Sequence, residues 1–163
     1  MQRAWHGLTA TLLTTRPGLV SLTASEHVVG LHTGRPVQAR CRLDGRTQRR
    51  VQSRGDVVLV PAGASGAWDD DRASQMLLLS VSTALVQKAA RGLGLDGDSV
   101  ALTPRLQVRD PQIQHLGWAL EDELAGDPAD SLYGDSLAMA LAVHLVRRHR
   151  VSSAAADPPA RAG

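Results

Sequence analysis

The chain has 163 residues, of which 43% are hydrophobic and 21% charged. This length predicts one domain that can bury a core without metals, and the single cysteine, Cys41, excludes an internal disulfide bond. A formal net charge of +2, with arginines spread from Arg3 to Arg161, does not indicate a nucleic-acid-binding face. Because the sequence has no signal-peptide pattern and no run of 18 apolar residues, we expect a cytoplasmic protein without membrane contact.

The first two-thirds of the chain has the pattern of short β-strands. Val37, Ala39 and Cys41 alternate with polar residues, which is typical of a strand with one buried face, and Asp44-Gly45 predicts a hairpin turn after it. Trp68 follows in a loop rich in Gly, Ala and Ser. The predicted strands occupy residues 9–14, 19–23, 26–32, 37–43, 47–52, 57–60 and 76–81. Short strands at this spacing indicate a sandwich or barrel.

The last third has helical patterns. A short helix is predicted at 84–92, and Asp110 with Pro111 predicts the start of a longer one. A second long helix is predicted from about Ala129 to Arg150 and is apolar on nearly all sides, so part of it needs a partner chain. We therefore expect a homodimer through the residues Leu137, Leu141, His144 and Leu145. The predicted organisation is a barrel at 1–108, a helical hairpin at 109–150 and a disordered tail at 151–163.

One string, Gly55 to Gly63, has the form G-x5-P-x-G, which resembles the second conserved motif of the cupin superfamily. In metal-binding cupins a histidine stands three positions after the last glycine, but Gly66 stands there in this chain. His27 and His32 are five residues apart, and an odd separation on a strand directs the two rings to opposite faces. We therefore predict no metal site and no cofactor.

Three segments taken together, residues 26–32, 55–63 and 132–149, resemble the sensor part of AraC-type bacterial transcription regulators. The resemblance spans roughly residues 5–150. It implies a cupin-like β-barrel, or double-stranded β-helix, that holds a small-molecule effector, followed by two long antiparallel helices that dimerise. In that family two helix-turn-helix motifs follow and bind DNA. The sequence after Arg150 is too short for them, so we expect no direct nucleic-acid binding by this chain.

The predicted function is therefore effector binding that sets the state of a regulator. Cys41 is interpreted as a buried apolar residue, because no base lies near it in sequence to activate a nucleophile. Trp68 would either close over a ligand or fix its loop to the barrel. The candidate cavity residues, assigned by strand alternation, are His32, Ala39, Cys41, Leu59 and Trp68.

Two other functions stay open. The chain could be a stand-alone, metal-free cupin enzyme, although no residue is assigned a catalytic role. It could also be a partner without DNA-binding motifs that pairs with a full-length regulator and inhibits it. Several ionisable groups converging in the barrel would favour the enzyme, whereas an apolar pocket with one or two polar anchors would favour sensing.

Overall fold

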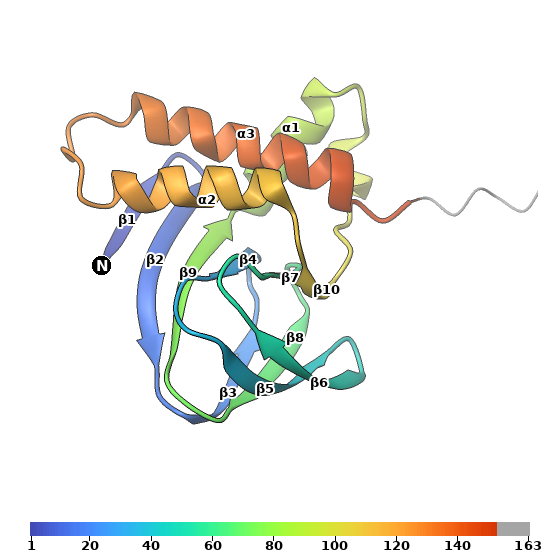
Figure 1. The fold of residues 1–163 in the computed structure, drawn as a ribbon. Coiled ribbons are helices and arrows are strands. Elements are labelled where there is room, and N and C mark those ends of the chain that lie inside the picture. The colour runs from blue at the N-terminus through green and yellow to red at the C-terminus, as the bar shows by residue number, and fades with distance from the viewer. Residues whose placement is uncertain (153–163) are drawn as a thin grey trace, which may run out of the picture.

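The computed structural model describes residues 1–152. Of the predicted disordered tail at 151–163, residues 153–163 lie outside the described residues, and the Val151 amide donates a hydrogen bond to the Ala101 carbonyl at 2.7 Å. The predicted combination of mainly β-structure with C-terminal helices is confirmed, and the strands form two antiparallel sheets (Figure 1). Among residues 1–152, no helix has both the length and the hydrophobicity that crossing a bilayer requires.

The larger sheet has six strands. Its order is β1 (Gln2–Trp5), β2 (Leu8–Thr15), β9 (Ser74–Val81), β4 (His27–His32), β7 (Val57–Val60) and β10 (Arg105–Val108). The smaller sheet has four strands, in the order β3 (Gly18–Thr23), β8 (Ser65–Asp70), β5 (Val37–Leu43) and β6 (Arg46–Gln52). Apart from the β5–β6 hairpin, successive strands from β2 to β9 therefore alternate between the two sheets, which face each other.

Local sequence accounts for the β5–β6 hairpin. Along β5, every second residue is buried, as the alternation predicts. Asp44 and Gly45 both adopt positive φ, 52° and 72°, which is the conformation that a tight hairpin turn needs. Strand β8 is a correction, because Ser65–Asp70 was expected to form a loop. It forms a strand because β3 and β5 flank it and pair with it along its length.

Three α-helices cover the outer face of the six-stranded sheet. They are α1 (Thr83–Gly92), α2 (Pro111–Glu123) and α3 (Leu132–His149), with a short 3-10 helix, η1 (Gly97–Ser99), between α1 and β10. Helices α2 and α3 lie side by side, and the four-stranded sheet lies on the side of the molecule away from them (Figure 1). Helix α3 begins three residues later than expected, because the Asp127 carboxylate accepts a hydrogen bond from the Ala129 amide and closes a turn.

The six-stranded sheet is buried on both faces, so the molecule has two apolar clusters. On β7, Val57 and Leu59 point toward the helices, whereas Val58 and Val60 point toward the second sheet. The cluster under the helices also contains Leu31, Leu79, Ile113, Leu120, Leu141 and Leu145. The cluster between the sheets contains Ala24, Val28, Leu43, Val58 and Val60.

Of the residues predicted to form a dimer interface, Leu137, Leu141 and Leu145 belong to the cluster under the helices, and His144 is a buried polar residue of the same helix. Leu141 and Leu145 are fully buried, and Leu137 and His144 are less than a tenth exposed. Their burial within one chain leaves little of their surface free for contact with a second chain. The apolar faces of α3 are covered by the sheet and by the neighbouring helices α1 and α2.

Candidate functional site

A cavity of about 150 Å³ lies between the two sheets. Most of its wall is apolar. The larger sheet contributes Leu13, Val28, Val58, Val60, Met76 and Leu78, and the smaller sheet contributes Val20, Leu22 and Trp68. Both sheets thus turn the apolar face of their alternating strands toward the same space.

Asp70 is the ionisable group on the wall of this cavity. Its Oδ1 atom is buried and has no hydrogen-bond partner among the described residues. Burial raises the pKa of this carboxyl above its ordinary value; a positive charge on His32 lowers it, and the charges of Asp71 and Asp69 raise it. The site therefore presents a hydrogen-bond acceptor that the protein itself leaves unsatisfied.

Gln52, on β6, is another polar residue of the wall and is 7% exposed. Its Nε2 atom donates to Cys41 Sγ across 3.7 Å. Because a thiol sulfur is a weak acceptor, this amide can exchange that contact for a stronger acceptor on a ligand.

His32 and Ser74 meet at one end of the cavity. Ser74 is on the cavity wall, and its Oγ lies 3.4 Å from His32 Nδ1. His32 Nε2 lies 2.7 Å from the Arg35 carbonyl oxygen. A carbonyl can only accept, so Nε2 carries a proton and, on the neutral ring, Nδ1 accepts from the serine hydroxyl. His32 itself lines a smaller hollow that shares Gln52, Val58 and Met76 with the cavity.

Of the five residues predicted to line a ligand site, Trp68 alone is on the wall of this cavity. His32 lies beside it. Ala39 and Cys41 are buried on the inner face of β5, but their register partners on β8, Asp70 and Trp68, line the cavity instead. Leu59 is elsewhere, in the cluster beneath the helices.

The position of Leu59 has a physical reason. Because all four residues of β7 are buried, alternation of polar and apolar residues cannot show which of them faces the cavity. Sequence reasoning missed Val58 and Val60 for this reason. It also missed Asp70, because Asp69, Asp70 and Asp71 together have the pattern of a polar turn.

The thiol of Cys41 is fully buried. Burial raises its pKa to about 11, while Arg50 lowers the pKa and Asp70 raises it. The thiol is therefore neutral near pH 7 and is not activated as a nucleophile.

The two histidines of β4 do not converge. His27 Nδ1 accepts a hydrogen bond from the Ala62 amide, 3.1 Å away, and burial lowers the pKa of this imidazole. His32 lies at the opposite end of the strand and points toward the second sheet. The pair therefore offers no shared position for an ion.

No protein-family model matches the chain, and a search of curated proteins finds no significant match. Solved structures give partial likenesses. A cupin superfamily protein from Desulfitobacterium hafniense is 20% identical, with a TM-score of 0.42 over 50% of this chain and 74% of that one. A conserved protein of unknown function from Streptococcus pyogenes is 22% identical, with a TM-score of 0.38 over 47% of this chain and 65% of that one.

The EutQ protein of Clostridium difficile is 12% identical, with a TM-score of 0.38 over 46% of this chain and 56% of that one. The chain thus spans less than two thirds of the Streptococcus and Clostridium proteins. At these identities and TM-scores, the likeness concerns part of the fold and says nothing of a ligand or an activity.

Proposed function

We propose that this chain is a small-molecule-binding domain, and that its ligand occupies the cavity between the two sheets. The observation that carries the proposal is the buried, unpartnered carboxylate oxygen of Asp70 on a wall that is otherwise mainly apolar. Apolar cavities of about 150 Å³ admit molecules about the size of benzene. The ligand is therefore a compact molecule with an apolar body.

The ligand also carries a hydrogen-bond donor. A buried acceptor without a partner costs about 1–3 kcal/mol, and an N–H group of a ligand beside Asp70 removes that cost. Gln52 and Ser74 line the same cavity and offer further polar groups to the molecule. One or two polar anchors in an apolar pocket are typical of binding sites for small molecules.

The finer proposal is a cupin-like barrel, that is, a double-stranded β-helix. Its support is the strand order, because β2–β9–β4–β7 and β3–β8–β5–β6 place eight successive strands in two facing antiparallel sheets, as in a jelly roll. Strands β1 and β10 extend the edges of the first sheet.

The regulatory role rests on the resemblance of the three sequence segments to AraC-type sensors. We propose β2 as the route of such a signal. Leu13 and Thr15, at one end of this strand, line the cavity, and at the other end Leu8 pairs with Trp5 of β1, which contacts α3. A ligand shifts this arrangement only through a difference in its affinity for two states.

The binding proposal is tested with two probes of similar size, benzylamine and toluene, titrated into the full chain and followed by NMR. We expect both to shift signals of the cavity residues, with benzylamine bound about tenfold or more tightly because it donates to Asp70. Asp70→Asn should reduce this preference. Asp69→Asn is the matched control, since its side chain is exposed on the same strand.

Filling the cavity gives the second arm of the test. Val58→Phe should abolish binding of both probes while the far-ultraviolet circular dichroism stays that of a folded protein. The proposal is overturned if neither probe binds saturably to the wild type, or if the Val58→Phe protein is folded and binds both as the wild type does.

A metal-free enzyme is the second candidate. It is favoured by His32, Ser74 and Asp70, which gather near one end of the cavity and could move a proton. The discriminating result is chemical conversion of a bound probe that is lost in His32→Gln, whereas a sensor returns every probe unchanged.

The homodimer and the inhibitory partnership are separate proposals. Sedimentation equilibrium of the chain tests the first. Capture of a full-length AraC-type regulator by the purified chain, compared with the regulator's own self-association, tests the second.

A further inference from the structure

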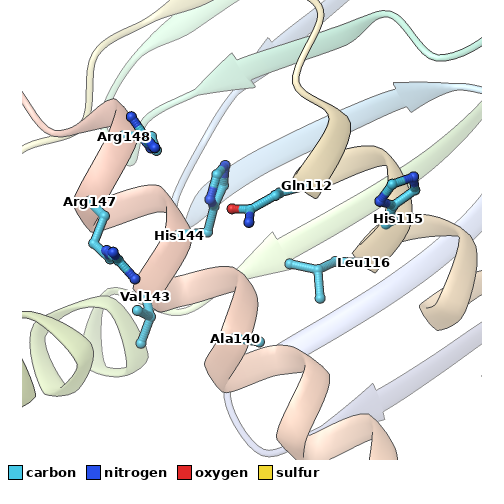
Figure 2. A pocket seen from close by; sticks show the side chains of 8 residues that line it. All are labelled: Gln112, His115, Leu116, Ala140, Val143, His144, Arg147 and Arg148. Carbon is cyan, nitrogen blue, oxygen red and sulfur yellow. The ribbon is translucent and has the colours of Figure 1, made fainter.

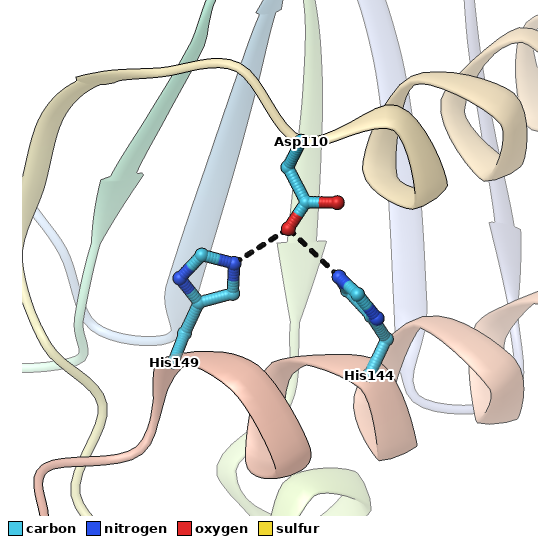
Figure 3. Close-up of side chains that lie close together, drawn as sticks. All are labelled: Asp110, His144 and His149. Atoms are coloured by element: carbon cyan, nitrogen blue, oxygen red, sulfur yellow. Dashed lines mark hydrogen bonds and ion pairs between the residues drawn. The ribbon is translucent and has the colours of Figure 1, made fainter.

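Asp110, His144 and His149 meet where α2 begins and α3 ends (Figure 3). The Oδ2 atom of Asp110 lies 2.8 Å from His144 Nε2 and 2.7 Å from His149 Nε2. One ligand atom from each of the three residues lies within 4.8 Å of the other two. The side chains are 12%, 10% and 6% exposed, respectively.

The backbone around these residues holds them in position. The other carboxylate oxygen of Asp110, Oδ1, caps α2 by accepting hydrogen bonds from the amides of Gln112 and Ile113 at 3.1 and 3.2 Å. The carbonyl of His149 accepts a hydrogen bond from the Thr103 amide at 2.7 Å. This bond joins the end of α3 to the segment before β10. The side chains of the cluster therefore project from backbone that is held in place by hydrogen bonds.

We propose that Asp110, His144 and His149 bind a divalent transition-metal ion, and that Zn²⁺ matches this set best. Imidazole nitrogen and carboxylate oxygen are ligands that Zn²⁺ and its neighbours in the first transition row accept. Ligand atoms that sit about 2.1 Å from an ion in the tetrahedral arrangement that Zn²⁺ prefers are about 3.4 Å apart. The separations from Oδ2 to the two Nε2 atoms, 2.8 and 2.7 Å, are those of hydrogen bonds. An ion therefore replaces these two bonds and requires the ligand atoms to move apart by about 0.6–0.7 Å.

The electrostatics favour a cation. Burial raises the pKa of Asp110, but hydrogen bonds from His144, His149 and the Ile113 amide outweigh it and hold the pKa at about 2. The carboxylate is therefore ionised at neutral pH. Within residues 1–152, no lysine or arginine forms an ion pair with it, so no fixed positive side chain occupies the position of an ion.

A groove of about 480 Å³ between α2 and α3 reaches the cluster on the side of His144 (Figure 2). Gln112 and His144 lie beside each other on its wall, and His115 lies farther along α2. Arg147 and Arg148 of α3 also line the groove, so an ion that enters passes two positive side chains before it reaches the ionised carboxylate. The groove gives an ion a route from solvent and leaves room for water as a further ligand. Three protein ligands with an open position are typical of zinc sites that exchange their remaining ligand.

The proposal is tested by titrating Co²⁺ into the full chain, because visible absorption reports both stoichiometry and coordination, and by Zn²⁺ competition against a chromophoric chelator. We expect one equivalent to bind, and His144→Gln or His149→Gln to weaken binding about 100-fold or more. Asp110→Asn keeps the helix-capping oxygen and should also weaken binding. His115→Gln is the matched control, since it changes an exposed histidine of the same groove without changing a ligand.

A second measurement uses the unmodified protein, so that misfolding of a variant cannot obscure the result. Saturating Zn²⁺ should shift the side-chain NMR signals of His144 and His149 but not those of His27 and His32, and should raise the Tm by about 5–10 °C at a hundredfold excess over Kd. The proposal is overturned if neither Co²⁺ nor Zn²⁺ binds saturably, or if the double variant His144→Gln/His149→Gln binds as tightly as the wild type. The cluster would then be a hydrogen-bonded link between two helices.

Discussion

The indole of Trp5, the last residue of β1, lies directly against Gly134 in the first turn of α3, so closely that a Cβ atom at position 134 would overlap the ring. Beside it, the guanidinium of Arg3 donates to the backbone carbonyls of Glu123, Asp127 and Asp130 at 2.6–2.9 Å. The N-terminal strand is thus fastened to the turn between α2 and α3, and through β2 it connects this turn to the cavity.

The first prediction concerns Gly134→Ala. Helix propensity alone favours alanine by about 1 kcal/mol, but the methyl group has no space beside Trp5, and overpacking typically costs about 1–3 kcal/mol. We expect a net loss in the free energy of unfolding by urea. Gly92→Ala, at the end of α1, is the control, because nothing lies within 4 Å of its added Cβ and it should stabilise or leave the protein unchanged. Equal effects of the two substitutions would rule out the Trp5 contact.

The second prediction separates the two faces of β7. Leu59→Ala should cost about 2–5 kcal/mol of unfolding free energy, because it leaves a void in the cluster beneath the helices. Val58 borders space that is already empty, and Val58→Ala removes fewer atoms than Leu59→Ala does. It should therefore cost less unfolding free energy. Urea denaturation measures both, and a larger loss for Val58→Ala would reverse the assignment of the two faces.

The third prediction follows from the raised pKa of Asp70. Burial, the main cause, makes the folded protein bind this proton more tightly than the unfolded chain does. Its contribution to stability is therefore complete below the ordinary carboxyl pKa and is lost as the pH rises through the raised value. Asp70→Asn cannot ionise, so its stability relative to the wild type should increase from pH 3 to pH 7. Urea midpoints across this range, with Asp69→Asn as the comparison, measure the change, and a constant difference would exclude it.

The fourth prediction concerns the Cys41 thiol. Its pKa of about 11 and its complete burial predict that a disulfide reagent such as DTNB reacts with the folded protein at pH 8 about 100-fold or more slowly than with the chain unfolded in guanidinium. The rate is followed by absorbance of the released thiolate. Similar rates in the two states would mean that the Cys41 thiol is accessible and activated in the folded protein.

The sequence by itself determined the features that depend on neighbours along the chain. The alternation in β5, the Asp44-Gly45 turn and the Asp110 cap with Pro111 each follow from contacts within a few residues, and the structure contains all of them. The two-residue period of a strand likewise predicts that the rings of His27 and His32 point to opposite faces, and in the structure the two rings have different partners.

Only the tertiary structure decided which buried residues share a space. A strand that is apolar on both faces, such as β7, and a helix that is apolar on nearly all sides, such as α3, carry no local mark of what covers each face. In the folded chain, Leu59 and Leu141 lie in the same cluster, whereas Val58 lines the cavity. It also brought Asp110 to two histidines that lie 34 and 39 residues away in the sequence, because the turn between α2 and α3 lays the end of one helix beside the start of the other.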